Sequence, residues 1–285
     1  MTPGGGAKAF CSQVESLGVA EMRLNKQTER DADLHPALAG VDGCKAGWIA
    51  VHRAADAAPL VSVFPRFQAL LDALPDATIA VDMPIGLPDL SRRGGRGPEA
   101  LVRPLLGARQ SSVFAIPSRA ALYADTSDFT TVEAWYAAHR RASAVAMATS
   151  DPPRGVSIQA FGIFAKIREI DALLIERSDL RGRIFESHPE VAFCRLNGGA
   201  AMALPKKIKG AVNPAGMDER KALLCRHGYE KAFLDQPPPK GAASDDFLDA
   251  AAMMLIAGRI ASGEARPSPD PPLTDRFGIP VAIWA

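Results

Sequence analysis

The sequence predicts an α/β fold in which a mixed sheet is flanked by helices and carries further helical insertions. Three apolar runs near residue 40 are joined by turns too short for a helical crossover, which indicates an antiparallel meander. A fourth apolar run, "ATIAVD", follows a short amphipathic helix. The second half of the chain has mainly helical periodicity.

The first half supplies most of the sheet. Strands are expected at 38–41, 47–52 and 60–64, and "FQALLDAL" places its apolar residues on one face of a helix over 67–74. The next strand has the continuous apolar character of a buried strand and ends at Asp82, before Pro84.

The second half is expected to be mostly helical. Helices are predicted over 131–148, over 157–177 with Ser157 as N-cap, and over 189–197 with a left-handed stop at Gly198. A short strand, Ile184 to Glu186, precedes the third of these. The last helix, "SDDFLDAAAMMLIAGRIA", is expected to begin after Ser244 as N-cap, and the proline-rich stretches 236–239 and 267–272 are interpreted as loops.

Composition limits the classes of protein to be considered. The chain has 285 residues, is 47% hydrophobic and carries a formal net charge of +1, so no field of the whole molecule attracts nucleic acid or membrane. No apolar run approaches the ~20 residues that span a bilayer, and no export signal is visible, so we expect a cytoplasmic protein without a membrane partner. Residues 1–37 are interpreted as a disordered extension, and 38–285 as one domain.

Carboxylates recur where elements of the predicted sheet end. Asp42, Asp82 and Glu186 each follow an apolar strand, and Asp246 and Asp249 lie three residues apart on one helical face. Such acids can converge on hard divalent cations, which prefer oxygen ligands, and the absence of a Cys/His cluster favours Mg²⁺ or Mn²⁺ over zinc. The first-choice metal ligands are Asp42, Asp82 and Asp246.

Each acid also has a structural interpretation. Asp42 and Asp82 could cap turns beside Gly43 and Pro84. Acids in the first turn of the last helix, such as Asp246, could act only on the helix dipole, and Glu186 could pair with a nearby arginine such as Arg183.

Basic and hydroxyl side chains follow two of the acids and could contact a phosphate backbone. One set lies in or after the loop that follows Asp82, and the other accompanies Glu186; the candidates are Arg92, Arg93, Arg96, Arg109, Ser111, Ser112, His188 and Lys207. The alternative is that the arginine-rich loop is merely solvated. His188, which precedes a proline, could equally make a structural hydrogen bond.

Six blocks of the sequence resemble a known family in the same order. They are "GVDGCKAGWIAV", "AVDMPIGLP", "LLGARQSSVFAIPSRA", "FESHPEVAFCRLNGG" followed by "KKIKG", "DDFLDAAA" and "FGIPVAIWA". Together they are similar to the family called domain of unknown function 429, a predicted nuclease family assigned a ribonuclease H-like fold. The resemblance implies an essential Asp on the first strand and an acid at the end of the fourth, at positions that match Asp42 and Asp82. It also implies acids on a C-terminal helix, at Asp246 and Asp249, and Glu186 matches the family's "E-x-H-P-E" block.

These observations favour a metal-dependent phosphodiester hydrolase that acts on nucleic acid. In such chemistry, paired Mg²⁺ or Mn²⁺ ions activate water and stabilise the leaving oxygen. Two alternatives stay open. A phosphotransferase of the actin-like or sugar-kinase type also uses an early Asp in a glycine turn, and a non-catalytic binding module would keep the fold without the metal.

Overall fold

The computed structural model describes Met1 and residues 36–285, and its centre is a five-stranded mixed sheet. Three strands form the expected antiparallel meander: β1 (Leu38–Cys44), β2 (Gly47–Arg53) and β3 (Leu60–Phe64). On the other side of β1, β4 (Thr78–Val81) and β7 (Ile184–Glu186) continue the sheet in parallel, giving the order β3-β2-β1-β4-β7. A mixed α/β architecture is therefore confirmed.

Helices and three short two-stranded sheets complete the described part of the chain. The helices are α2 (Phe67–Ala73), α3 (Pro98–Val102), η1 (Arg103–Ser112), α4 (Arg119–Leu122), α5 (Val132–Ala148), α6 (Ile158–Gly162), α7 (Phe164–Glu176), η2 (Ser178–Gly182), α8 (Pro189–Leu196), α9 (Pro214–Arg226), α10 (Lys231–Asp235) and α11 (Ser244–Ala261). The short strands are β5 (Ser91–Arg92) with β6 (Ser150–Asp151), β8 (Lys207–Ile208) with β9 (Ala211–Val212), and β10 (Pro267–Thr274) with β11 (Pro280–Trp284).

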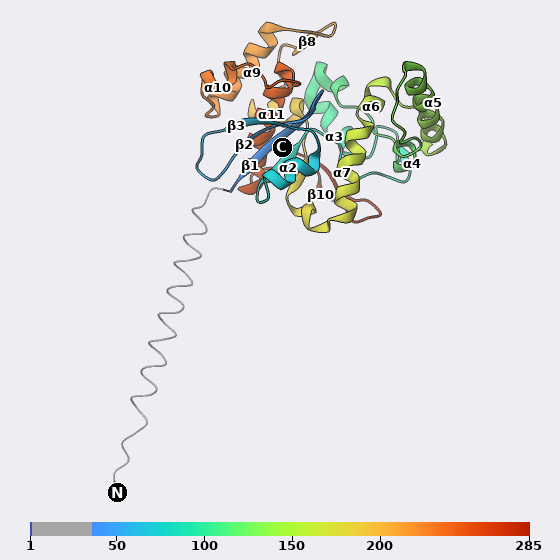
Figure 1. Cartoon of the computed structure of the whole chain (residues 1–285), viewed down its shortest axis with the longest axis horizontal. Coiled ribbons are helices and arrows are strands. Elements are labelled where there is room, and N and C mark those ends of the chain that lie inside the picture. Colours follow the sequence, from blue (N-terminus) through green and yellow to red (C-terminus); the bar gives the residue numbers. More distant parts are fainter. Residues whose placement is uncertain (2–35) are drawn as a thin grey trace.

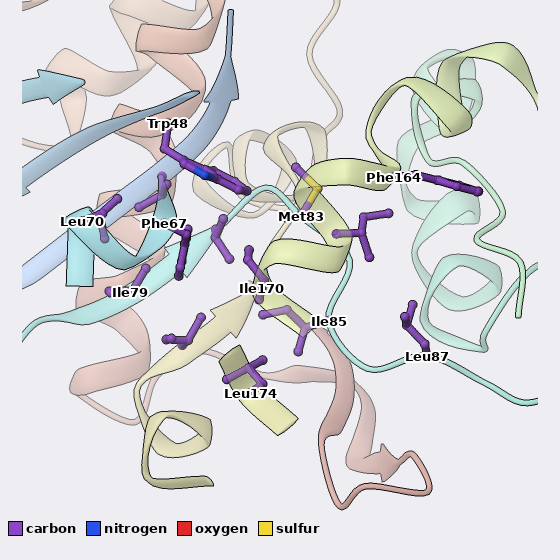
Figure 2. Close-up of a cluster of buried hydrophobic side chains, with 14 of the residues drawn as sticks. Trp48, Phe67, Leu70, Ile79, Met83, Ile85, Leu87, Phe164, Ile170 and Leu174 are labelled. Carbon is purple, nitrogen blue, oxygen red and sulfur yellow. The ribbon is translucent and has the colours of Figure 1, made fainter. Parts of the chain in front are cut away.

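The sheet is covered on both faces, and residues of each strand alternate between them. Side chains such as Trp48 and Ile79 pack against α2 and α7, as Figure 2 shows for Phe67, Leu70 and Ile170. The opposite face of the sheet packs against α11, with α8, α9 and α10 around it. In Figure 1, α9, α10 and β8 gather beside α11, whereas α4, α5 and α6 lie on the other side of the molecule.

Gly40 allows α11 to lie directly against β1. A Cβ atom at this position would be 1.9 Å from the backbone nitrogen of Met254 and 2.1 Å from the carbonyl oxygen of Ala250. Real Cβ atoms do not approach backbone so closely, so only glycine fits between this strand and this helix. The contact sets how near the N-terminal half of α11 comes to the end of β1.

Two sequence-based boundaries were wrong. Strand β1 does not stop at 41 but continues through Cys44, because Asp42, Gly43 and Cys44 pair with β2 and leave only a two-residue turn before Gly47. The helix expected over 157–177 is broken into α6 and α7 after Gly162, a residue that lowers helix stability. Ser157 is the N-cap of α6, as predicted, and its hydroxyl accepts from the Ala160 amide at 3.1 Å.

Two further differences concern the end of the chain. The N-cap of α11 is Ala243, not Ser244, which is the first helical residue. The proline-rich stretch 267–272 is not a loop but most of β10, an edge strand whose pairing with β11 is interrupted between Ser268 and Leu273. Prolines are tolerated there because an edge strand and a bulge need fewer backbone donors.

The last two expectations concern the N-terminal extension and a membrane-spanning helix. The predicted extension at 1–37 falls almost entirely outside the described residues, so it and the single-domain assignment stay predictions. Among the helices of the described residues, none combines the length and apolarity that a bilayer crossing needs.

We predict that Gly40→Ala lowers the free energy of unfolding by about 3 kcal/mol, the upper range for overpacking, because its methyl group would collide with the backbone of α11. Gly162→Ala is the matched control, since a Cβ there meets nothing within 4 Å and alanine favours the helix. Urea unfolding followed by far-UV circular dichroism measures both. Equal stabilities for Gly40→Ala and the control would show that the close packing of α11 on β1 is not required.

Candidate functional site

Asp42 and Asp82 are neighbours on two parallel strands. Val41 pairs with Val81, and the amide of Asp82 donates to the carbonyl of Val41 at 2.9 Å, so the two aspartates stand side by side. Ala80 packs with the α11 cluster and Gly40 touches α11, so by strand alternation both carboxylates are on the face that α11 covers. The register thus places two acids together on one face.

α11 adds acids to this pair. Ala250 packs against Gly40, so the turn of α11 that precedes Ala250 lies towards the end of β1. That turn carries Asp246 and Asp249. The negative charge of Asp249 acts on both strand aspartates more strongly than that of Asp246. Asp246 accepts a hydrogen bond from the Ala243 amide at 2.9 Å, so it also caps the start of the helix.

A lysine lies among these carboxylates. The Lys206 ammonium donates to Asp249 and is 3.9 Å from Asp245, and its charge also acts on Asp42 and Asp82. Lys206 comes from the segment just before β8, which Figure 1 places beside α9, and the Lys206 side chain is 26% exposed. This lysine is therefore a cation supplied by the chain itself to the acidic cluster.

The cluster is crowded with negative charge despite Lys206. Burial and the charge of Asp249 raise the pKa of Asp82 to about 8, and burial together with Asp82 and Asp249 raises the pKa of Asp42 well above its usual range. Burial also raises the pKa of Asp249 to about 6, although Lys206 opposes that shift. One carboxylate oxygen of Asp249 is buried and has no hydrogen-bond partner in the described part of the chain. Such a site favours binding of additional positive charge.

Glu186 faces away from this cluster because of its register, although its charge still raises the pKa of Asp82. It pairs with Val81, so it points to the same face as Val81, opposite to Asp82. There, Arg96 binds both of its carboxylate oxygens, at 2.9 and 2.6 Å, and Glu99 binds the same guanidinium at 2.8 Å. An arginine thus pairs with Glu186, as the structural interpretation predicted, but this arginine is Arg96 and not Arg183, which donates to the carbonyls of Leu74 and Ala77 instead.

A pocket of about 170 Å³ opens between the strand ends and α7. Asp42 and Asp82 line it, together with Lys166 and His188. The Lys166 ammonium donates to the carbonyl of Gly47 at 2.6 Å and lies 4.7 Å from the centre of the Trp48 ring. The pocket therefore combines carboxylates with a cation that is held in place by its neighbours.

His188 is neutral in this wall. Its Nε2 lies 3.3 Å from the carbonyl oxygen of Ser112, and burial lowers its pKa to about 4. The other ring nitrogen, Nδ1, is buried and has no hydrogen-bond partner within the described residues. With Nε2 donating its proton, Nδ1 is a hydrogen-bond acceptor.

The remaining candidates for phosphate contacts are dispersed. Arg92 and Arg93 are exposed on and beside the short strand β5, whereas Arg96 is buried in its ion pairs. The Lys207 ammonium forms an ion pair with buried Asp245 at 2.6 Å, which makes Asp245 an ion-pair partner and not only a residue of the first helical turn. The other three candidates lie at the end of η1. Ser112 lines the pocket, Ser111 is exposed, and Arg109 is partly buried.

A divalent cation fits this donor set chemically. Asp42, Asp82 and Asp249 offer carboxylate oxygens, the ligands that Mg²⁺ and Mn²⁺ take. One oxygen of Asp249 is buried and has no hydrogen-bond partner among the described residues. With the Lys206 ammonium on Asp249, however, no group of three or more His, Cys, Asp or Glu side chains among residues 36–285 is arranged around a metal position. A metal at this place would have to displace the Lys206 ammonium.

Comparison with known proteins identifies the family. A family model described as "Protein of unknown function (DUF429)" matches residues 40–274, which is most of the chain. The chain belongs to the DUF429 family. No curated protein and no solved structure matches it. Membership confirms the resemblance found in the sequence blocks, and by itself it assigns no reaction.

The candidates selected from the sequence did not include two site residues of this DUF429 protein. Lys166 is a single charged residue within an apolar helical pattern, and nothing local indicates that it reaches the end of β1. Lys206 lies in a basic run typical of a solvated or phosphate-binding loop, yet its ammonium binds an acid 43 residues away in sequence. Both depend on tertiary packing, which leaves no local signal.

We predict that Asp82→Asn stabilises the metal-free protein, and more at pH 8 than at pH 6.5. The folded state raises the pKa of Asp82 from 3.8 to about 8, so between these values it retains a proton that the unfolded chain loses. The stability of the wild type therefore falls as the pH rises through this window, and asparagine removes that loss.

Urea unfolding in EDTA at the two pH values, both at or above the usual pKa of histidine, measures the effect. Asp89→Asn, at an exposed position, is the control and should have the pH dependence of the wild type. The same pH dependence in Asp82→Asn as in wild type would contradict a proton shared by this cluster.

Proposed function

We propose that this DUF429 protein is a metal-dependent phosphodiester hydrolase built on a ribonuclease H-like sheet. The observation that carries the proposal is the convergence of Asp42, Asp82 and Asp249 at one end of the sheet, beside a pocket that has a fixed lysine. Carboxylates that raise one another's pKa need a counter-charge, and a divalent cation supplies more of it than one lysine can.

Strand order and the positions of the acids support the ribonuclease H-like assignment. A three-stranded meander is continued by parallel strands next to β1, with Asp42 on the first strand and Asp82 directly after the fourth. These are the places where the family resemblance puts acids. Asp249 lies on the long helix α11 near the end of the chain, as that resemblance also implies.

The acids would share the metal unequally. Asp249 is the acid of α11 whose charge acts most strongly on Asp42 and Asp82, so these three would hold the metal, whereas Asp246 is committed in part to the Ala243 amide. A bound divalent cation lowers the pKa of its water and offsets charge on a phosphoryl group. This set replaces Asp246, the ligand expected from the sequence, with Asp249.

Other pocket residues would bind and orient the phosphodiester. Lys166, fixed by the Gly47 carbonyl and the Trp48 ring, offers a positive charge at the pocket wall. His188 is neutral and presents Nδ1 as a hydrogen-bond acceptor, which suits a hydroxyl or a water molecule. Neither residue depends on the metal for its position.

The alternatives find less support. A phosphotransferase of the actin-like type needs a second domain with the same hairpin, and in residues 36–285 the five-stranded sheet is accompanied only by two-stranded ones. A binding module would have no need of carboxylates with raised pKa beside a lysine, and metal titration separates it from the hydrolase.

We predict that Lys206→Gln binds Mn²⁺ about tenfold more tightly than the wild type, because the competing ammonium is removed from Asp249. Isothermal titration calorimetry with Mn²⁺ measures the affinity of both proteins. Lys209→Gln, at an exposed position three residues further on, in the turn between β8 and β9, should bind Mn²⁺ like the wild type. Weaker binding in Lys206→Gln than in the wild type would mean that the lysine does not occupy the cation position.

Asp42→Asn should lower phosphodiester hydrolysis at least about a hundredfold, a larger loss than for a residue outside the metal's own ligands. The assay is release of nitrophenol from bis(4-nitrophenyl) phosphate in Mn²⁺. The variant should unfold at or above the wild-type temperature, since one crowded charge has been removed. Wild-type protein that binds Mn²⁺ but releases no nitrophenol would refute the hydrolase on this substrate class.

A further inference from the structure

A second pocket, of about 510 Å³, lies next to the carboxylate pocket. The extended segment that follows η1 separates them, and Val113 and Phe114 line both. The last two residues of η1 line different pockets: Ser112 lines the carboxylate pocket, and Ser111 lines the second one. A ligand that passes over this segment would therefore reach both pockets.

The second pocket is lined with hydrogen-bond donors and positive charge. Arg103 and Arg154 face it together with Gln110, Ser111 and Gln159. Among the described residues that line it, none is an aspartate or glutamate. The nearby carboxylate of Glu99 binds Arg96 at 2.8 Å, and its charge also acts on Arg103, so it offsets part of the positive charge at this pocket.

The two arginines are positioned from different parts of the chain. Arg103 donates from Nε to the Val113 carbonyl at 3.0 Å and from Nη1 to the Gly94 carbonyl at 2.7 Å, which fixes the guanidinium. Arg154 is exposed on the loop after β6, and its amide donates to the Ser150 hydroxyl at 2.8 Å, which closes that loop. Burial lowers the pKa of Arg103, Glu99 opposes that shift, and the positive charge of Arg154 adds to it. The two arginines therefore act on each other across the pocket, and an anion between them would interact favourably with both.

We infer that this second pocket binds a phosphate of the nucleic acid strand adjacent to the phosphodiester at the carboxylate site. Arginine guanidinium groups with serine and glutamine side chains are the donors that proteins use for backbone phosphates. A subsite of this kind would give the protein a preference for a strand over an isolated phosphodiester. The inference rests on the proposed hydrolase for the role of the neighbouring pocket, but the binding it describes does not require the metal.

The test compares binding of a fluorescein-labelled single-stranded oligonucleotide of about ten nucleotides, in EDTA, by fluorescence anisotropy at several salt concentrations. Arg154→Gln should weaken binding three- to tenfold and reduce the salt slope by about one, as expected for one phosphate contact. Arg140→Gln removes the same charge from an exposed position on α5 and should bind like the wild type. Arg154 is chosen because its side chain is exposed, so the variant should fold normally.

Three results would overturn the inference. They are equal affinity and salt slope for Arg154→Gln and wild type, no measurable binding of the oligonucleotide by wild type, and a variant that loses binding of pyrophosphate but not of the oligonucleotide. The last would assign the pocket to a free phosphate compound.

Hydrolysis of bis(4-nitrophenyl) phosphate separates this inference from the proposed function. That substrate has no adjacent phosphate, so Arg154→Gln should hydrolyse it at the wild-type rate. If the wild type does not hydrolyse it at all, the hydrolase fails while the oligonucleotide measurement still decides the phosphate subsite.

Discussion

The contact between α11 and β1 at Gly40 is the constraint on which the candidate site depends. A side chain of any size there would push the helix from the strand, and the acids of α11 would move away from Asp42. Because strand and helix touch through backbone, Asp249 comes close enough to raise the pKa of Asp42 and of Asp82. Holding these like charges together lowers the stability of the fold, and such strained groups of charges are characteristic of functional sites.

Register decides which strand-end acids join the cluster. Asp42 and Asp82 follow the paired residues Val41 and Val81, so they share a face, whereas Glu186 pairs with Val81 itself and shares the other. A shift of one residue reverses the face of every side chain in a strand. Glu186 therefore meets Arg96 on its own face of the sheet. On the other face, Asp249 accepts a hydrogen bond from Lys206, which comes from a segment outside the sheet.

Much of the fold could be predicted from the sequence, because strands and helices leave periodic patterns. The meander, the strand before Asp82, the N-cap at Ser157 and the left-handed Gly198 all follow from local residue types. The break between α6 and α7 and the strand made from 267–274 did not, because pairing and packing overrode the local pattern.

The carboxylates of the site could be named individually for the same reason. Which of these carboxylates face one another could not be predicted from the sequence. The face of Glu186 is fixed by strand register, and the position of Lys206 is fixed by tertiary contacts that involve α11.

We propose that a divalent cation takes the place of the Lys206 ammonium among Asp42, Asp82 and Asp249. A crystal structure of the protein grown with Mn²⁺, with anomalous scattering recorded at the manganese edge, tests this directly. We predict an anomalous peak within bonding distance of carboxylate oxygens of these three residues, about 2.2 Å away, with the Lys206 ammonium no longer on Asp249. A structure in which Lys206 remains bound to Asp249 and no manganese lies among the three carboxylates would contradict it.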